Sequence, residues 1–474
     1  MKKVHYPKDV LRSTVYGGIV GVLVGGVGAL FQLFIHWILA GQQAAFLALQ
    51  DNLFMLCVFS MVFSSGFVIL SLIIVRRLVP EASGSGVPEI EGTLEGVRKL
   101  RWWRVLPAKF IGGVMSLSSG LVLGREGPTI QMGGAIGQLV KSIFRLNNDY
   151  AHVLIAAGAG AGLATAFNAP LAGILFVIEE MRQQFKYSFQ SLQTVIVACV
   201  VADILLEALL QSVGYNIRQM MDIDMTAYGA PPLASLWLFI VFGAIFGALG
   251  VIFNKYLVCS LNFFTKRSGF HFWKWIVIIG AATGLLIVFF PHVVGGGYKV
   301  MPDVLHGEIA LSALITLFIL RFVTTLVSYG TGVPGGIFAP MLALGTIFGM
   351  FFGIITHALF PALITNPQVF AVAGMSALFT ATVSAPLTGI VLVVEMTMNY
   401  ALILPLIVTC FSATITAIFM GGSPIYSTLL SRTLVLAKRK TLYLSFKRRK
   451  KKDGKTSYIV SRVEPHPERS RRGG

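Results

Sequence analysis

The segment APLAGILFVIE at residues 169–179 decides the fold, because it recurs as APLTGIVLVVE at residues 385–395. The same offset of 216 residues also matches small residues upstream of both copies, such as Gly158 and Gly374. Two unrelated Ala- and Gly-rich helices are not expected to share a constant register and a trailing glutamate. The sequence therefore predicts that one structural unit occurs twice in the chain.

Around this repeat, the chain divides into two membrane repeats, residues 15–210 and 233–430. A polar linker, residues 211–232, joins them. A short N-terminal segment, residues 1–14, precedes the first repeat, and a basic tail, residues 431–474, follows the second. The boundaries fall where long apolar stretches give way to polar residues.

The composition excludes a soluble globular domain. The 474 residues are 55% hydrophobic and only 12% charged, with 50 glycines and a mean hydropathy of +0.78, as is typical of a polytopic, all-α membrane protein. Apolar stretches with the length of about 20 residues that a membrane helix needs recur along the chain, for example Val15–Leu39, Leu53–Val75, Leu236–Phe253 and Trp273–Phe290. Others, over residues 156–167 and 337–352, are shorter or interrupted by Gly and Pro, which favours helices that stop partway through the membrane.

The net charge of +18 lies mostly in the tail, where residues 432–474 hold 15 Lys and Arg and three acidic residues. No folded basic domain accompanies this tail, so a nucleic-acid partner is not indicated. Basic residues also cluster before the first apolar stretch, and both termini are therefore expected to be cytoplasmic. The number of crossings is then even, and two equal halves with odd numbers of crossings must be inverted. Inverted repeats place a substrate site at their interface near the membrane midplane.

Three segments rich in Gly and Pro are candidates for that site: GSGVP at residues 84–88, GREGP at 124–128 and GVPGGIFAP at 332–340. Each has the character of a helix start, although each alone also fits a simple loop or kink. Helix N-termini carry partial positive charge and unpaired N–H donors. Several that meet at one point bind an anion without any lysine.

Carboxylates in membrane spans are functional candidates because they are costly there. Glu126 is flanked by glycines at an expected helix start, where its ionised carboxylate mimics a bound anion and its protonated form leaves; pairing with Arg125 is the alternative. Glu179 has a repeat partner in Glu395, which indicates an architectural role such as capping backbone groups. Glu180 has no such partner, and this asymmetry favours it for proton entry.

These segments resemble the CLC chloride channel and transporter family. GSGVP, GREGP and GGIFAP at residues 335–340 look like its anion-selectivity segments, in the same order and separation. The similarity continues through FNAPLAGILFVIEEM at 167–181 and SAPLTGIVLVVEMT at 384–397, and it covers nearly all of residues 15–430. The resemblance implies a CLC-like inverted repeat of two helical halves with broken and tilted helices, in a homodimer with one pore per subunit.

The resemblance also implies roles for individual residues. Hydroxyls at Ser85 and Tyr426 contact the central chloride, with the backbone amides of Ile337 and Phe338 beside them. Glu126 is the gating glutamate and Glu180 the internal glutamate of the proton route. The selectivity segments contribute Gly84, Gly86, Pro88, Gly124, Arg125, Gly127, Pro128, Gly335, Gly336 and Pro340.

The sequence thus predicts a secondary active antiporter that exchanges chloride for protons. A serine at position 85 resembles members that prefer chloride over nitrate, and an acid at position 180 resembles exchangers, whereas pure channels commonly carry a neutral residue there. A passive chloride channel is the alternative.

An intramembrane enzyme is not indicated, since neither an HExxH nor a GxSxG pattern is present. The expected partners are chloride, protons, a second copy of the chain and lipid, with no cofactor or metal. The short tail leaves no room for paired cytoplasmic domains, which suggests a prokaryotic-type protein of the inner membrane.

Overall fold

The computed structural model describes residues 6–182, 188–215, 225–226 and 228–438. The chain forms two compact units, Met1–Leu429 and Leu430–Gly474. The basic tail from residue 439 onward lies outside the described residues, as do residues 216–224 and 227 of the expected linker. All helices named below lie in the first unit.

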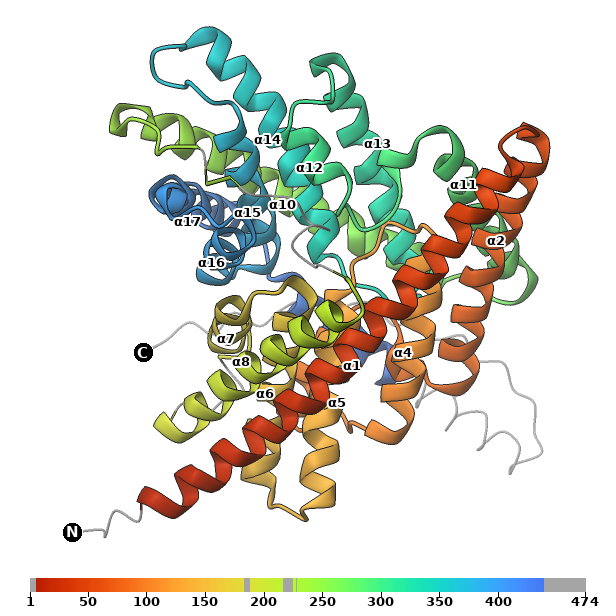
Figure 1. The fold of residues 1–474 in the computed structure, drawn as a ribbon, viewed down its shortest axis with the longest axis vertical. Helices are drawn as coiled ribbons and strands as arrows, with labels where there is room; N and C mark the ends of the chain where they lie inside the picture. Colours follow the sequence, from red (N-terminus) through yellow and green to blue (C-terminus); the bar gives the residue numbers. More distant parts are fainter. Residues whose placement is uncertain (1–5, 183–187, 216–224, 227, 439–474) are drawn as a thin grey trace, which may run out of the picture. The chain divides into compact units, whose positions relative to one another are not determined.

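The first half of this unit runs from red to yellow in Figure 1 and the second half from green to blue. The helices of the first half are α1 (Tyr6–Leu49), α2 (Leu53–Ile73), α3 (Val87–Leu94), α4 (Trp102–Ser118), α5 (Glu126–Ile143), α6 (Asn148–Phe167), α7 (Pro170–Glu179) and α8 (Phe189–Ser212). Those of the second half are α10 (Leu236–Thr265), α11 (Gly269–Phe289), α12 (Val300–Leu305), α13 (Leu311–Gly330), α14 (Phe338–Leu359), α15 (Gln368–Val383), α16 (Pro386–Thr397) and α17 (Ile403–Phe419). Single short π or 3-10 turns cover Ile74–Leu78, Pro80–Ala82, Leu233–Ser235, Pro291–Val293 and Tyr400–Leu402.

Nine helices of the described chain are long and apolar enough to cross a membrane. The all-α, multi-pass architecture predicted from the sequence is confirmed. Two expectations of short helices were wrong, because residues 156–167 lie in α6 and residues 338–352 lie in α14, and both helices reach spanning length. The short apolar helices are instead α7, α15 and α16. Although α14 is long, it begins inside the protein, and Ile337 and Phe338 are fully buried.

Close glycine contacts repeat between the two halves. In the first half, α5 and α6 approach so closely that a Cβ added to Gly133 would lie 2.0 Å from the carbonyl oxygen of Gly158. In the second half, Gly345 of α14 stands in the same relation to Gly374 of α15, also at 2.0 Å. Small residues permit such backbone approach in membrane helices. The glycines that match in the sequence therefore make equivalent contacts in each half.

The chain also reverses direction in the same way in both halves. After α6, Asn168 adopts a left-handed conformation with a φ of 55°, and after α15, Ser384 does so with a φ of 67°. A proline then starts the next helix, α7 or α16, in a position where no N–H is needed. The repeated sequence APL thus encodes one helix–turn–helix unit twice.

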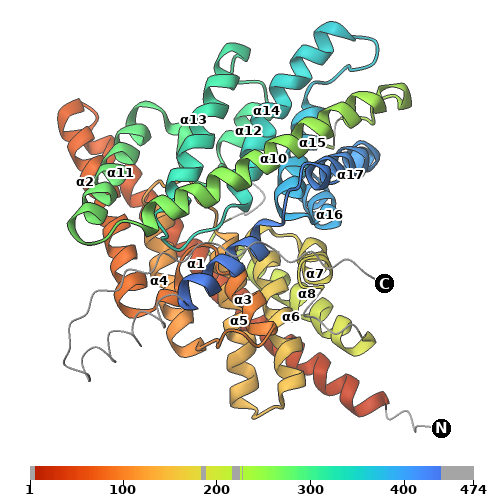
Figure 2. The same ribbon diagram turned by 180° about the vertical axis from the view of Figure 1, so that it is seen from behind.

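Helices α7 and α16 cap each other. The carboxylate of Glu179, at the end of α7, accepts the N–H groups of Leu387 and Thr388 at 3.0 and 2.8 Å. In return, Glu395 near the end of α16 accepts the N–H groups that open α7, at 3.0 and 2.8 Å. Each helix end therefore lies at the start of the other helix, so the two equivalent helices are antiparallel. Figures 1 and 2 show α7 and α16 as neighbouring helices. Their mutual capping confirms that the halves are inverted and that Glu179 is architectural.

We expect Glu179→Gln to lower the thermal unfolding temperature of the protein in detergent. An amide presents only one acceptor oxygen and no charge, so an N–H group of α16 loses its partner. Such a loss costs about 1–3 kcal/mol. The neighbouring Glu180→Gln is the matched control, because Glu180 caps no helix start in the described structure. Equal shifts for both variants would contradict the capping role.

Candidate functional site

The three predicted helix starts lie together at the junction of the two halves. Gly124 and Gly336 exchange main-chain hydrogen bonds of 2.9 and 2.7 Å, which form an isolated antiparallel bridge. The N–H of Gly335 donates to the carbonyl oxygen of Gly84 at 3.0 Å. The segments 84–88, 124–128 and 335–340 are thus joined directly through their backbones, as the sequence interpretation required.

The helices that begin here receive no side-chain hydrogen bond from their own N-cap residues. The N-cap residues are Gly86 for α3, Arg125 for α5 and Ile337 for α14, and none of them caps its helix through its side chain. By contrast, Asn52 and Asn147 cap α2 and α6 through side-chain oxygens. The N-terminal N–H groups of α3, α5 and α14 are therefore left for other acceptors.

Glycine is needed at this junction because the backbones approach so closely. A Cβ added to Gly127 would lie 2.8 Å from both the carbonyl oxygen and the Oγ of Ser85. A Cβ at Gly124 or Gly336 would collide with the carboxylate of Glu126, at 2.0 and 2.4 Å. The Glu126 carboxylate therefore packs directly against Gly124 and Gly336, in space that any larger side chain would fill.

Glu126 is fully buried and is the first residue of α5. Its Oε1 accepts the N–H of Ala339, in the first turn of α14, at 3.3 Å. Its Oε2 is buried and has no hydrogen-bond partner among the described residues. A carboxylate of the first half thus rests on a helix N-terminus of the second half, where negative charge is favoured.

Arg125 does not pair with Glu126, so the alternative reading of this carboxylate fails. Its Nη1 donates to Oε1 of Gln32 on α1 at 2.9 Å, and its guanidinium lies 4.4 Å from the ring centroid of Tyr298. The three ion pairs found in the described part of the chain lie elsewhere. Glu126 is held by backbone groups rather than by an opposite charge.

Two buried hydroxyls face no partner in the described structure. Ser85 is 1% exposed and Tyr426 is fully buried, and neither hydroxyl forms a hydrogen bond there. The ring of Tyr426 stacks on Phe338 with a centroid separation of 6.1 Å. Its hydroxyl is within electrostatic reach of both Glu126 and Glu180. Unsatisfied buried hydroxyls are costly and indicate a place for a polar or charged ligand.

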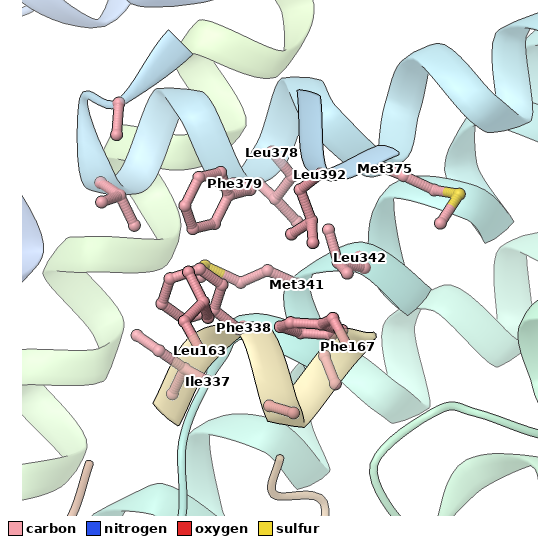
Figure 3. Packing of buried hydrophobic residues seen from close by; sticks show 14 of the residues in the cluster. Leu163, Phe167, Ile337, Phe338, Met341, Leu342, Met375, Leu378, Phe379 and Leu392 are labelled. Atoms are coloured by element: carbon pink, nitrogen blue, oxygen red, sulfur yellow. The ribbon is translucent and has the colours of Figure 1, made fainter. Parts of the chain in front are cut away.

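An apolar cluster fixes the start of α14. Figure 3 shows Phe338 close to Phe379 of α15 and Phe167 of α6, with ring centroids 4.4 and 6.2 Å away. Met341 lies in the same cluster, and its Sδ accepts the hydroxyl of Thr382 at 2.9 Å. Side chains from both halves therefore hold the first turn of α14 in place.

Glu179 and Glu180 face different ways, as expected for neighbours about 100° apart on a helix. While Glu179 caps α16, the carboxyl of Glu180 lies within hydrogen-bonding reach of the carboxyl of Glu91. Glu91 belongs to α3 and is 2% exposed. The sequence interpretation did not assign a role to Glu91, although a second glutamate two residues after Glu89 in a short helix was a usable signal.

A buried lysine was also missed. Lys109 of α4 is fully buried, and its Nζ donates to the carbonyl oxygens of Ala82 and Gly84 at 3.1 and 2.6 Å. It thereby anchors the loop that leads into α3. A single lysine inside an otherwise apolar stretch was the available signal, because such a charge is costly in a membrane span.

The fold and the site together define an inverted-repeat membrane protein in which three helix N-termini meet at the interface of its halves. A family model described as "voltage gated chloride channel" matches residues 66–417. The chain belongs to this family, the CLC family.

Relatives of known type are similar over nearly the whole chain. An H(+)/Cl(-) exchange transporter of Vibrio parahaemolyticus is 48% identical over 91% of this chain and 94% of its own. The protein of the same description from Salmonella arizonae is 44% identical over 91% of this chain and 90% of its own. The crystal structure of a slow cyanobacterial Cl-/H+ antiporter is 41% identical and superposes with a TM-score of 0.85, covering 90% of this chain and 98% of that one.

Proposed function

We propose that this protein is a secondary active antiporter that exchanges chloride for protons across a bacterial inner membrane. The observation that carries the proposal is the Glu126 carboxylate on the N-terminus of α14. A tethered anion there competes with a free anion for the same N–H groups. The relatives named as exchange transporters, and the cyanobacterial antiporter, support exchange over a passive channel.

In this proposal, chloride lies between Ser85 and Tyr426, where both hydroxyls are buried without partners in the described chain. The N–H groups of Ile337 and Phe338 contribute the partial positive charge of α14. Among the described residues, no lysine or arginine forms a hydrogen bond with either hydroxyl, so anion binding in this proposal stays weak enough for release.

Proton coupling follows from two carboxyls. When Glu126 is ionised, it occupies the helix N-termini and blocks the anion; when it is protonated, it loses its attraction for them and leaves. Glu180 supplies the proton from the cytoplasmic side, and Tyr426 lies near both carboxyls. One protonation event therefore decides which anion occupies the site, which links the two fluxes.

The test is to follow chloride efflux and proton uptake together in proteoliposomes. An exchanger drives protons uphill when a chloride gradient is imposed, and its reversal potential depends on the proton gradient. Chloride flux without proton movement in the wild type would make the protein a channel.

We further propose that the protein is a homodimer with one pore per subunit and with both termini cytoplasmic. Large apolar side chains on α7, α8, α16 and α17 remain exposed on the single chain: Leu171, Ile196, Ile204, Leu387, Leu404, Ile407 and Phe411. A second copy covers part of this surface, and lipid covers the rest. Because each chain contributes both halves, each subunit holds a complete site.

The chloride site makes a prediction about selectivity. Ser85→Pro is expected to raise nitrate transport relative to chloride, because the hydroxyl that suits a compact anion is lost. The shift is on the order of fivefold, the scale of about 1 kcal/mol for one hydrogen bond. Ser85→Ala removes only the hydroxyl and is the matched comparison. An unchanged nitrate-to-chloride ratio in both variants would remove Ser85 from the site.

A further inference from the structure

Tyr298 places a second unpaired hydroxyl next to the gating region. It lies between the turn Pro291–Val293 and α12, and its ring covers the guanidinium of Arg125 at 4.4 Å. Its hydroxyl is buried and makes no well-formed hydrogen bond within the described chain. The same hydroxyl lies close to the main-chain and side-chain nitrogens of Arg125 and within electrostatic reach of Glu126.

The loop that carries Tyr298 is held rigidly. Arg321 of α13 is fully buried and donates to the carbonyl oxygens of His292, Val294 and Gly295 at 2.6, 3.1 and 2.9 Å. The N–H of Gly295 also donates to the carbonyl oxygen of Gly120 at 2.9 Å, which ties the loop to the first half. The position of the Tyr298 ring is therefore preorganised and not a chance placement of a loose side chain.

Several buried polar atoms around Glu126 lack partners in the described structure. They are Oε2 of Glu126, Nε and Nη2 of Arg125 and the hydroxyl of Tyr298. Unsatisfied buried groups are rare and costly, and a cluster of them calls for an explanation. The guanidinium of Arg125 offers N–H donors, and the hydroxyl of Tyr298 is both a donor and an acceptor. Both groups lie beside the carboxyl of Glu126, which moves in the proposed exchange.

The chemistry of a protonated carboxyl matches this set. When Glu126 takes up a proton and leaves α14, it gives up the N–H of Ala339. Its new O–H needs an acceptor and its carbonyl oxygen needs a donor. The Tyr298 hydroxyl is able to accept the first, and the free N–H groups of Arg125 are able to donate to the second.

We propose that Tyr298 is a positioning residue whose hydroxyl, together with Arg125, receives the protonated carboxyl of Glu126 after it leaves the helix N-termini. This inference rests on the proposed exchange function and adds a docking partner to it. Tyr298 lies outside the three selectivity segments, so nothing in the sequence pattern pointed to it.

The test is Tyr298→Phe, which keeps the ring over Arg125 and removes only the hydroxyl. Without its acceptor the protonated, displaced state of Glu126 is less stable, so more acid is needed to populate it. We expect the external pH of half-maximal chloride flux to fall by about 0.7 unit, the equivalent of roughly fivefold for one hydrogen bond. Tyr256→Phe, on the exposed face of α10, is the matched control and leaves the midpoint unchanged.

Other titratable groups also face this region: Arg125 at the N-cap of α5, Arg321 on α13, Tyr215 after α8, His36 on α1 against Tyr215, and Tyr426. A double variant, Glu126→Gln with Tyr298→Phe, separates them from Glu126. If the hydroxyl acts through Glu126, adding Tyr298→Phe to Glu126→Gln changes neither flux nor pH profile.

Two results would overturn the inference: a wild-type midpoint in folded Tyr298→Phe, or a pH shift that persists in the Glu126→Gln background. Folding is checked by thermal unfolding and size-exclusion chromatography. If the proposed exchange function itself is wrong, the wild-type protein moves no protons in the same vesicles, and this result is distinct from both of the outcomes above. A coupled wild type with an unmoved Tyr298→Phe midpoint leaves exchange standing and removes only the role of Tyr298.

Discussion

Glu126→Gln is expected to leave chloride flowing through the protein while proton transport stops. Glutamine keeps the shape of the side chain and an acceptor oxygen for the N–H of Ala339. It carries no charge, however, and so competes poorly with chloride for the N-terminus of α14. It also binds no proton, which removes the link between proton uptake and anion occupancy.

Chloride efflux and proton uptake in proteoliposomes measure this directly. We expect proton uptake to fall to the level of vesicles without protein, and chloride flux to become nearly independent of external pH. Proton pumping against a gradient by Glu126→Gln would remove Glu126 from the coupling mechanism. The control is wild-type protein reconstituted at the same density.

Glu180→Gln is expected to abolish proton transport by a different route. Glu180 lies at the end of α7 against the carboxyl of Glu91, apart from the three joined helix starts. Its replacement leaves the anion site and Glu126 unchanged, so chloride still binds and flows. The proton no longer reaches Glu126 from the cytoplasmic side, and exchange becomes passive chloride flux.

The pH response distinguishes the two variants. External acid acts on Glu126, so chloride flux through Glu180→Gln still rises at low external pH, whereas flux through Glu126→Gln does not. Glu179→Gln is the matched neighbour and retains coupled transport in its folded fraction, because its carboxylate only caps α16. Retained proton pumping by Glu180→Gln would show that protons enter elsewhere.

The repeated segment predicted most of the fold. Glycines matched by the sequence make equal contacts in both halves, and the paired glutamates Glu179 and Glu395 cap each other's helices. Hydropathy placed the long spans but underestimated α6 and α14, because glycines interrupt the apolar runs of both helices and α6 begins with polar residues. Close helix packing stabilises such glycine-containing helices inside the protein, and local composition carries no record of that packing.

Only some residues around the candidate site could be predicted from the sequence, and the difference depends on where each residue lies along the chain. Glu126 and the glycines around it occupy one short motif, and spacing along the chain was enough to find them. Lys109, Glu91 and Tyr298 approach the site from other elements, and only the folded chain brings them there. A single ionisable residue in an apolar helix can be identified from the sequence as a functional candidate, but the sequence does not show which groups it contacts.

The bridge between Gly124 and Gly336 restricts how access to the two sides of the membrane alternates. Many inverted-repeat transporters rock one half against the other around a fixed site. Here the halves share main-chain hydrogen bonds at the site itself, and Ser116 of the first half also donates to the carbonyl oxygen of Pro334 in the second. A rigid-body swing would break these bonds in the low-dielectric interior, where they are costly to leave unmade. We infer that alternation in the proposed exchange is confined to small local movements, with the Glu126 side chain as the principal moving part.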